Sequence, residues 1–248
     1  DKFAGIISAC GLNLRKPRRH PRTTDSRHHL AKYPNKIKDL IPIRHNQVWV
    51  SDITYQAIWP AEGPDVYDFV YISLVTDAYS KEILGWSVGP TLEAVYPIAA
   101  LHMAIDSSGK ENIKDLIHHS DRGLQYASIE YVAILREYGI AISMTENGNP
   151  KDNPIAERSN ETLKDELLKG MVFRSLKEVR AALSIVIPFY NRERPHMSLN
   201  GMTPQEVSGM QGEIPKQWKS YREIAIKKLH LEQKVVTLPT VTQYPFLP

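Results

Sequence analysis

Cysteine is almost absent from this sequence: Cys10 is the only one among 248 residues. A single cysteine excludes a disulfide framework and a cysteine-rich zinc site, and it fits a reducing compartment. No stretch approaches the roughly 20 apolar residues of a membrane-spanning helix, and no signal-peptide pattern begins the chain. Hydrophobic residues make up 42% of the chain and charged residues 24%, which predicts a folded soluble protein that we expect in the cytoplasm.

Acidic residues are scarce at the start of the chain. Residues 1–45 hold eleven Lys or Arg but three acids, whereas the net charge of the whole chain is only +3. A basic arm joined to a mildly acidic body predicts a polyanion partner, although a solvated leader without a partner fits the charge equally well. Because the chain begins with Asp1 rather than Met, we expect a piece of a longer protein. The basic residues of the central part of the arm are Arg15, Lys16, Arg18, Arg19 and Arg22.

Patterns typical of regular structure begin near residue 47. Strands are predicted by β-branched and aromatic runs at 48–55, 69–75, 83–88, 113–118 and 140–143. Helices are predicted from Thr91 to about 106, from Ser128 to about 138, from Asn153 to about 169, and from Ser175 onward. A leading antiparallel meander followed by alternating helices and strands predicts a mixed α/β sheet with helices on its faces.

Three carboxylates stand out because of their settings. Asp52 lies inside the first predicted strand, where burying a charge is costly unless it is paired or binds a metal. Asp121 follows the fourth strand, at a carboxyl end where ligands gather in α/β sheets. Glu157 lies one turn into the helix that begins near Asn153. Each acid taken alone is more often a turn, cap or helix-dipole residue, so the hypothesis of a shared site depends on all three.

Carboxylate oxygens are the ligands that Mg²⁺ and Mn²⁺ prefer in proteins. Two such ions about 3.5–4 Å apart can activate the attacking oxygen and stabilise the leaving oxygen of a phosphodiester. Asp52, Asp121 and Glu157 together therefore indicate metal-dependent chemistry on a phosphodiester.

The spacing of these acids resembles a known catalytic triad. Thirty-five residues separate Asp121 from Glu157, with Asp52 on a first strand upstream. This arrangement resembles retroviral integrases and bacterial insertion-sequence transposases of the DDE class, and the surrounding words are similar to the transposase group. Five motifs carry the resemblance in order, at 48–55, 119–126, 148–157, 163–166 and 190–199.

The resemblance implies a ribonuclease-H-like fold with a mixed five-stranded sheet and helices on both faces. It implies a metal-dependent polynucleotidyl transferase in which Asp52, Asp121 and Glu157 hold Mg²⁺ or Mn²⁺, as two ions. The implied partner is DNA, bound by a homo-oligomer, with no membrane and no small-molecule cofactor. The implied divisions are a basic arm at 1–45 left from an upstream DNA-binding region, a catalytic core at 46–207 and a C-terminal extension at 208–248.

The sequence departs from the relatives it resembles at three points. Residues 56–66 form a longer loop than expected between the first two strands. Lys81 stands where relatives usually have Arg, and Glu146 adds an acid to the loop before Glu157. None of these changes touches the three carboxylates.

Further residues are candidates for DNA contacts. Asn160 and Lys164 follow Glu157 by three and seven residues. On an α-helix this spacing places them close to the helix face that carries the Glu157 side chain. For Asn160 the alternative is a solvated helix face, and for Lys164 it is a surface ion pair with Glu161. Arg194 and His196 can either contact DNA or brace the helix of Glu157. Asp77 begins a turn and is interpreted as structural. Histidine is not the usual partner of Mg²⁺, so His118 and His119 are not assigned to the metal.

The leading hypothesis is a DNA transposase that cleaves element ends and transfers the strand through a 3′-hydroxyl. One alternative is a metal-dependent nuclease of the same fold that does not join DNA. The other is an inactive, domesticated DNA-binding protein, which the presence of Asp52, Asp121 and Glu157 argues against.

Overall fold

The computed structural model describes residues 2, 9, 10, 21, 23, 24, 28–60, 67–146 and 153–236. Within them lies a five-stranded sheet with the strand order β3-β2-β1-β4-β5. The first three strands pair antiparallel, whereas β4 and β5 run parallel to β1. This mixed sheet confirms the predicted fold class. The strands are β1 (Val48–Ile58), β2 (Asp68–Asp77), β3 (Ile83–Gly89), β4 (Ile117–Ser120) and β5 (Ala141–Met144).

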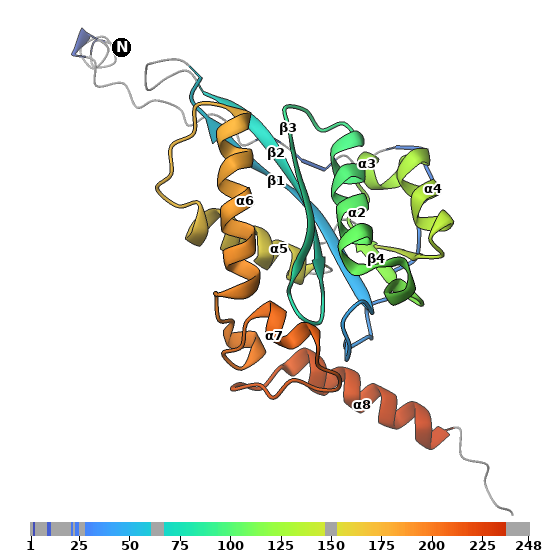
Figure 1. Cartoon of the computed structure of the whole chain (residues 1–248). Coiled ribbons are helices and arrows are strands. Elements are labelled where there is room, and N and C mark those ends of the chain that lie inside the picture. Colours follow the sequence, from blue (N-terminus) through green and yellow to red (C-terminus); the bar gives the residue numbers. More distant parts are fainter. Residues whose placement is uncertain are drawn as a thin grey trace, which may run out of the picture.

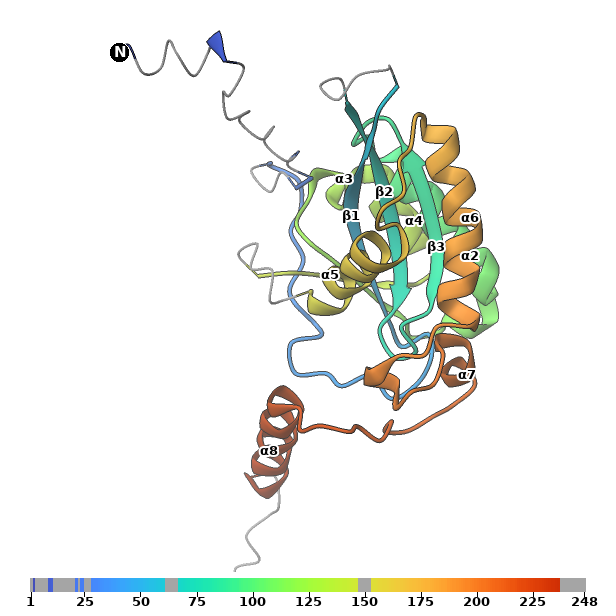
Figure 2. The ribbon, with the colours of Figure 1, turned by 90° about the vertical axis from the view of Figure 1, so that its left-hand side faces the viewer.

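Helices cover both faces of the sheet (Figures 1 and 2). One face packs against α2 (Val95–Ser108), α3 (Leu124–Ala127) and α4 (Ile129–Glu137), around buried side chains such as Trp49 and Leu101. The other face packs against α5 (Pro154–Glu161) and α6 (Leu176–Arg192), around Ile72 and Leu183. Each face therefore buries its own apolar cluster, and burial on both sides stabilises the central strands.

Strand β1 decides where the candidate site lies. Side chains alternate along a strand, so Asp52 shares a face with Val48 and Val50, which pack beneath α5. The pairing of β1 with β4 ends at Val50↔His119. Beyond that pair the two parallel strands part, and Asp52 lies just past the point where they separate.

Several predicted boundaries were wrong. Strand β1 continues to Ile58, so residues 56–58 belong to the strand rather than to the predicted loop, because they pair with the start of β2. The strand predicted at 113–118 is β4 (Ile117–Ser120), because its parallel pairing with β1 starts only at Ile117, and the residues before it form a 3-10 helix, η1 (Lys110–Ile113). Thr91 does not cap a helix: α2 starts at Val95. The segment between is held by tertiary contacts, because Leu92 packs on the core and its carbonyl accepts a hydrogen bond of 2.9 Å from the Gln125 side chain.

The helix predicted from Asn153 to about residue 169 is also interrupted. The α-helical part ends at Glu161, and a π-helix, η3 (Thr162–Leu167), follows. Single π-helical turns inside helices are uncommon and occur often at functional sites. Asn153 begins α5, but its side chain makes no capping bond; it donates instead to the carbonyl of Ser51 at 3.1 Å. This bond ties the start of α5 to β1.

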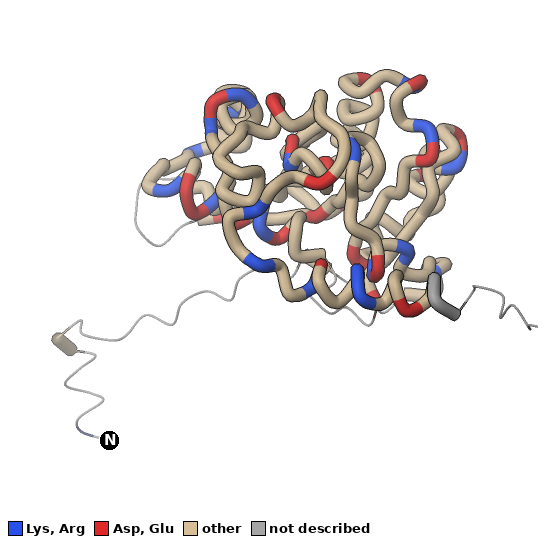
Figure 3. Tube along the Cα trace, turned by 90° about the horizontal axis from the view of Figure 1, so that it is seen from below, with Lys and Arg blue, Asp and Glu red and all other residues tan. Residues whose placement is uncertain are grey.

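The end of the chain carries structure that the sequence did not indicate. After α6 come η4 (Met197–Leu199), α7 (Pro204–Ser208) and α8 (Tyr221–Val236). Arg222 ties α8 to residues 28–45, since its guanidinium donates to the carbonyls of Ile37 and Lys38. Basic and acidic positions are interspersed over the body seen from below (Figure 3). None of the helices in the described ranges is long and apolar enough to cross a membrane.

Candidate active site

Asp52 is held from β1 toward α5. Its Oδ2 accepts a hydrogen bond of 2.7 Å from Nδ2 of Asn160. Burial raises the pKa of Asp52 to about 7, and the negative charges of Asp121 and, less strongly, Glu157 act in the same direction. The backbone N–H of Ile53 and the Asn160 amide oppose this rise. A carboxylate that is costly to ionise alone is well suited to bind a cation.

Asp121 follows the last residue of β4, where the chain leaves the sheet. Its Oδ1 accepts a hydrogen bond of 2.8 Å from the backbone N–H of Gly123, and its Oδ2 accepts one of 2.5 Å from the Thr24 hydroxyl. Burial raises the pKa of Asp121, while these two bonds and nearby His28 oppose the shift. Gly123 leaves room for this contact, because a Cβ there would lie 2.9 Å from Oδ1 of Asp121.

Glu157 lies in the first turn of α5 and is partly exposed. Burial raises its pKa, and the neighbouring charge of Glu161 adds to the effect. Three acids from β1, the end of β4 and α5 thus face one region at the edge where β1 and β4 separate. Within the described ranges, no three His, Cys, Asp or Glu side chains already lie close enough to enclose a metal ion.

The donor chemistry of this region fits a hard divalent cation. Asp52 and Asp121 supply carboxylate oxygens, and the negative charge of Asp121 adds to the effect of burial in raising the pKa of Asp52. Asn160 adds a buried Oδ1 without a hydrogen-bond partner. Oxygen ligands of this kind suit Mg²⁺ or Mn²⁺ rather than a soft metal.

Asn160 and Lys164 lie differently from the continuous helix that the sequence predicted. Asn160 is buried, and its amide contacts Asp52 rather than solvent. Lys164 belongs to the π-helix, so the α-helical spacing from Glu157 does not apply to it. Its ammonium lies 4.0 Å from the centre of the Tyr55 ring. The alternative partner, Glu161, pairs with Arg158 at 3.3 Å instead.

Arg194 and His196 brace the end of the helix that carries Glu157. Arg194 pairs with Glu166 in η3, and its guanidinium lies 3.2 Å from Nε2 of His196. The His196 ring packs edge-on against Tyr190 at 4.7 Å. Burial lowers the pKa of His196 to about 4, and the positive charge of Arg194 adds to the effect. These contacts support the bracing interpretation, and a direct DNA contact by either residue stays a prediction.

Of the remaining candidates, Asp77, His118 and His119 are buried, and the basic arm residues lie outside the described ranges. The carboxylate of Asp77 accepts bonds from the backbone N–H groups of Asn46, Tyr79 and Ser80, so it organises a turn as predicted. His118 is buried against the hydroxyls of Ser51 and Tyr131. His119 lies 2.9 Å from the Ser143 hydroxyl. The five basic arm residues lie outside the described residues: Arg15, Lys16, Arg18, Arg19 and Arg22.

Comparison with known proteins assigns the family. Two family profiles described as Integrase core domain match residues 42–150 and 138–204. Transposase InsF for insertion sequence IS3A from Escherichia coli K12 is 31% identical over 205 residues, covering 82% of this chain and 68% of that protein. A 31 kDa protein of insertion element IS600 from Shigella sonnei is 34% identical over 206 residues, covering 82% of this chain and 72% of that protein. The chain belongs to this family of insertion-sequence transposases with an integrase core domain.

Two further matches show how much of a relative this chain spans and which fold it shares. A protein of insertion sequence element IS986/IS6110 from Mycobacterium tuberculosis H37Rv is 36% identical over 170 residues. That match covers 67% of this chain but only 59% of the relative. A chain of the simian T-cell lymphotropic virus intasome, in complex with PP2A regulatory subunit B56 gamma, has a TM-score of 0.55 at 17% identity and covers 80% of this chain and 66% of that chain. This similarity confirms the integrase-type, ribonuclease-H-like fold.

Two residues near the carboxylates were not singled out from the sequence. Thr24 lies in the basic arm, 97 positions before the aspartate whose Oδ2 it contacts. Gly123 follows Asp121 by two residues in the 119–126 motif, but its close approach to the carboxylate appears only in three dimensions. The contact of Thr24 could not be predicted, since no periodicity links an extended arm to a particular strand end.

Proposed function

We propose that this chain is the catalytic part of a DNA transposase. It would cleave phosphodiester bonds at the ends of a mobile element and join the released 3′-hydroxyl to target DNA. The observation that carries the proposal is the convergence of Asp52, Asp121 and Glu157 from three separate elements, with the pKa of Asp52 raised by burial and by the other two charges. Membership of the transposase family supports the same reading.

We infer that Asp52, Asp121 and Glu157 hold two Mg²⁺ or Mn²⁺ ions. When bound, such ions activate the attacking oxygen and stabilise the leaving oxygen of a phosphodiester. The chain itself contributes orientation. Asn160 fixes one oxygen of Asp52, and the backbone N–H of Gly123 fixes one oxygen of Asp121. Carboxylates held in this way lose less conformational entropy when they bind a ligand.

DNA contacts are proposed beyond the carboxylates. Lys164, half-buried over Tyr55, is suited to hold a backbone phosphate as a point charge. Asn160, Arg194 and His196 stay candidates beside it. We further propose that the basic arm at 1–45, the core at 46–207 and the extension at 208–248 act as distinct parts, that the protein works on DNA as a homo-oligomer, and that it acts in the bacterial cytoplasm at the nucleoid.

The test is a cleavage and joining assay on DNA that carries the ends of the element, with Mg²⁺ and with a chelator. Asp52→Asn, Asp121→Asn and Glu157→Gln should each lower cleavage at least about a hundredfold, because losing several kcal/mol of metal-dependent stabilisation is worth that much. Circular dichroism should show that all three variants remain folded. Near-normal cleavage by any of them would remove that residue from the site.

Matched controls separate these variants from a general loss of negative charge. Glu137→Gln lies at the exposed end of α4, and Asp68→Asn lies at the exposed start of β2. Both should keep wild-type rates. Cleavage without joined product would favour the nuclease alternative, and DNA binding without metal dependence would favour the inactive DNA-binding alternative.

A further inference from the structure

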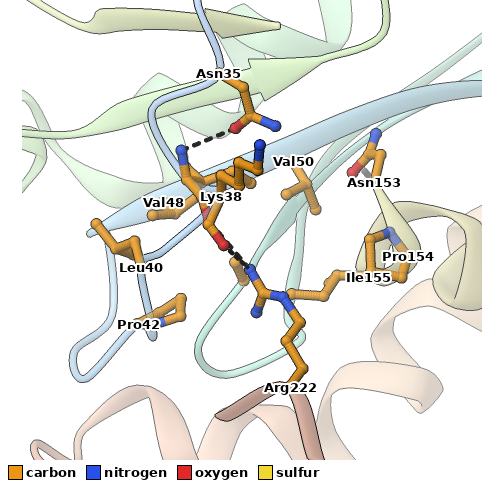
Figure 4. Close-up of a pocket in the computed structure, with 12 residues that line it drawn as sticks. Asn35, Lys38, Leu40, Pro42, Val48, Val50, Asn153, Pro154, Ile155 and Arg222 are labelled. Atoms are coloured by element: carbon orange, nitrogen blue, oxygen red, sulfur yellow. Dashed lines mark hydrogen bonds between the residues drawn. The ribbon is translucent and has the colours of Figure 1, made fainter. Parts of the chain in front are cut away.

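A cavity of about 260 Å³ lies on the side of α5 that faces the C-terminal extension. Its walls come from the β2–β3 turn, from the start of α5, and from residues 213–227. A smaller cavity of about 90 Å³ shares Ala78, Ile155 and Arg222 with it, and there the guanidinium of Arg222 bonds to the backbone beside Lys38 (Figure 4). We call the larger space the basic cavity, and its charged and hydroxyl groups include Lys81, Ser198, Lys216, Ser220 and Arg222.

Positive charge in the basic cavity exceeds what its acids neutralise. The two glutamates in its walls are both paired: Glu213 with Lys227 at 2.6 Å, and Glu223 with Lys216. Lys81 and Arg222 have no carboxylate within ion-pair distance among the described residues, and both donate to backbone carbonyls instead. Two cations facing one space without acidic partners repel each other, and an anion between them would relieve that repulsion.

Lys81 is held in an unfavourable state. Its backbone φ is 65°, a left-handed conformation that a lysine seldom adopts. Burial lowers the pKa of its ammonium to about 8. The negative charges of Asp77 and Glu223 oppose this fall, and the positive charges of Lys216 and Arg222 add to it. Backbone strain of this kind persists where the surroundings enforce it, often at functional sites. The turn therefore keeps a positive group at the wall of the cavity at a cost in stability.

We propose that the basic cavity binds a backbone phosphate of the DNA on which the chain acts. The hydroxyls of Ser198 and Ser220 in its walls suit the oxygens of a phosphate. Trp218, 47% exposed at the same cavity, offers a ring on which a neighbouring base can stack. Pro154 and Ile155, also in the wall, belong to the first turn of α5, so the basic cavity lies at the start of the helix that carries Glu157.

The site assigns a role to the C-terminal extension. The family profiles end at residue 204, whereas Lys216, Trp218 and Arg222 follow it. These residues line the basic cavity together with Lys81 of the core. The extension therefore completes a phosphate site that the core alone would leave open.

The assignment of DNA as the ligand rests on the proposed function, so the test measures DNA binding separately from cleavage. The affinity for a fluorescent DNA duplex of arbitrary sequence is measured at several salt concentrations, in chelator, for wild type and for the double variant Lys81→Gln with Arg222→Gln. Loss of one phosphate contact should make the slope of log K against log salt shallower by about 0.9. Lys81→Arg, which keeps the charge, should retain the wild-type slope.

The control is Lys228→Gln, which removes one charge from α8 at an exposed position outside the basic cavity. An unchanged slope in a folded double variant, or an equal change in Lys228→Gln, overturns the proposal. A thermal-shift titration with inorganic phosphate distinguishes the source of the ligand. Phosphate could raise the melting temperature of wild type but not of the double variant, while both bind DNA with the same salt slope. That result would assign the site to free phosphate and overturn the DNA contact. If the proposed function were wrong, cleavage would be absent while the salt slopes of wild type and the double variant still differed.

Discussion

The side-chain amide of Asn160 donates a hydrogen bond of 2.7 Å to Oδ2 of Asp52, joining the helix of Glu157 to the strand of the first aspartate. This contact lowers the pKa of Asp52 against the stronger effect of burial. It also leaves Oδ1 of Asn160 buried without a partner. The contact of Asn160 in the described structure is therefore with Asp52, and a contact of Asn160 with DNA stays a prediction.

Replacing Asn160 should shift the pH dependence of cleavage. In Asn160→Ala the pKa of Asp52 should rise above its value of about 7, so a larger share is protonated at neutral pH and unable to bind a cation. A hydrogen bond to a charged group is worth about 1.5–3 kcal/mol, so cleavage at pH 7 should fall roughly tenfold or more and recover at higher pH. Rates are measured from pH 6 to 9, together with DNA affinity. A pH profile identical to wild type, with weaker DNA binding, would make Asn160 a DNA contact instead.

Neutralising Asp52 should stabilise the protein in a pH-dependent way. The folded-state pKa is about 7 and the usual value is 3.8, so the folded state binds the proton more tightly than the unfolded state does. Ionisation of Asp52 therefore lowers stability as pH rises through 7, and this cost is absent below about pH 4. In chelator, Asp52→Asn should be more stable than wild type at pH 8, by at most about 4 kcal/mol at 1.36 kcal/mol per pKa unit.

The gap between Asp52→Asn and wild type should close as the pH falls to 4. Thermal unfolding at pH 4, 6 and 8 measures it, with the exposed Asp68→Asn as control, which should show no such trend. A gap that is constant with pH would mean that Asp52 is not a strained carboxylate.

Thr24 should compete with metal for Asp121. Its hydroxyl donates to Oδ2, and the other oxygen is already held by Gly123, so both oxygens of Asp121 are engaged. Thr24→Val removes the competing donor and should lower the Mg²⁺ concentration needed for half-maximal thermal stabilisation, by up to roughly tenfold for a bond to a charged group. Thr23→Val is the matched control. If both variants behaved like wild type, the arm would not restrict access to Asp121.

Lys164 should matter for DNA rather than for metal. Lys164→Ala should weaken binding of a cleaved DNA end and slow joining, because the ammonium held over Tyr55, three residues after Asp52 on β1, is lost. The contact with Tyr55 is worth only about 0.5–1 kcal/mol, so the fold should survive. Lys169→Ala, two residues beyond η3, serves as the control. End-DNA affinity and joining rate are measured at two salt concentrations, and equal values for Lys164→Ala and wild type at both would exclude it from the site.

Much of the architecture was predictable because local patterns carry it. The β-branched and aromatic run of β1, the turn at Asp77 and the helix start at Ser175 are local features, and the structure retains each of them. The settings of Asp52, Asp121 and Glu157 could be derived from strand and helix patterns. Their joint assignment came from the 35-residue spacing and from the surrounding motifs.

The sequence by itself determined the residue types at the carboxylate site, the order of strands and helices, and the family resemblance. Only the tertiary structure decided which groups touch them: Asn160 on Asp52, Thr24 on Asp121, and the π-helical turn that carries Lys164 over Tyr55. It also decided that Lys81 and Arg222, 141 positions apart in sequence, line one cavity. The physical reason is that such contacts join residues far apart in the chain. Packing of α5 and the C-terminal extension against the sheet fixes them, and no local periodicity encodes that packing.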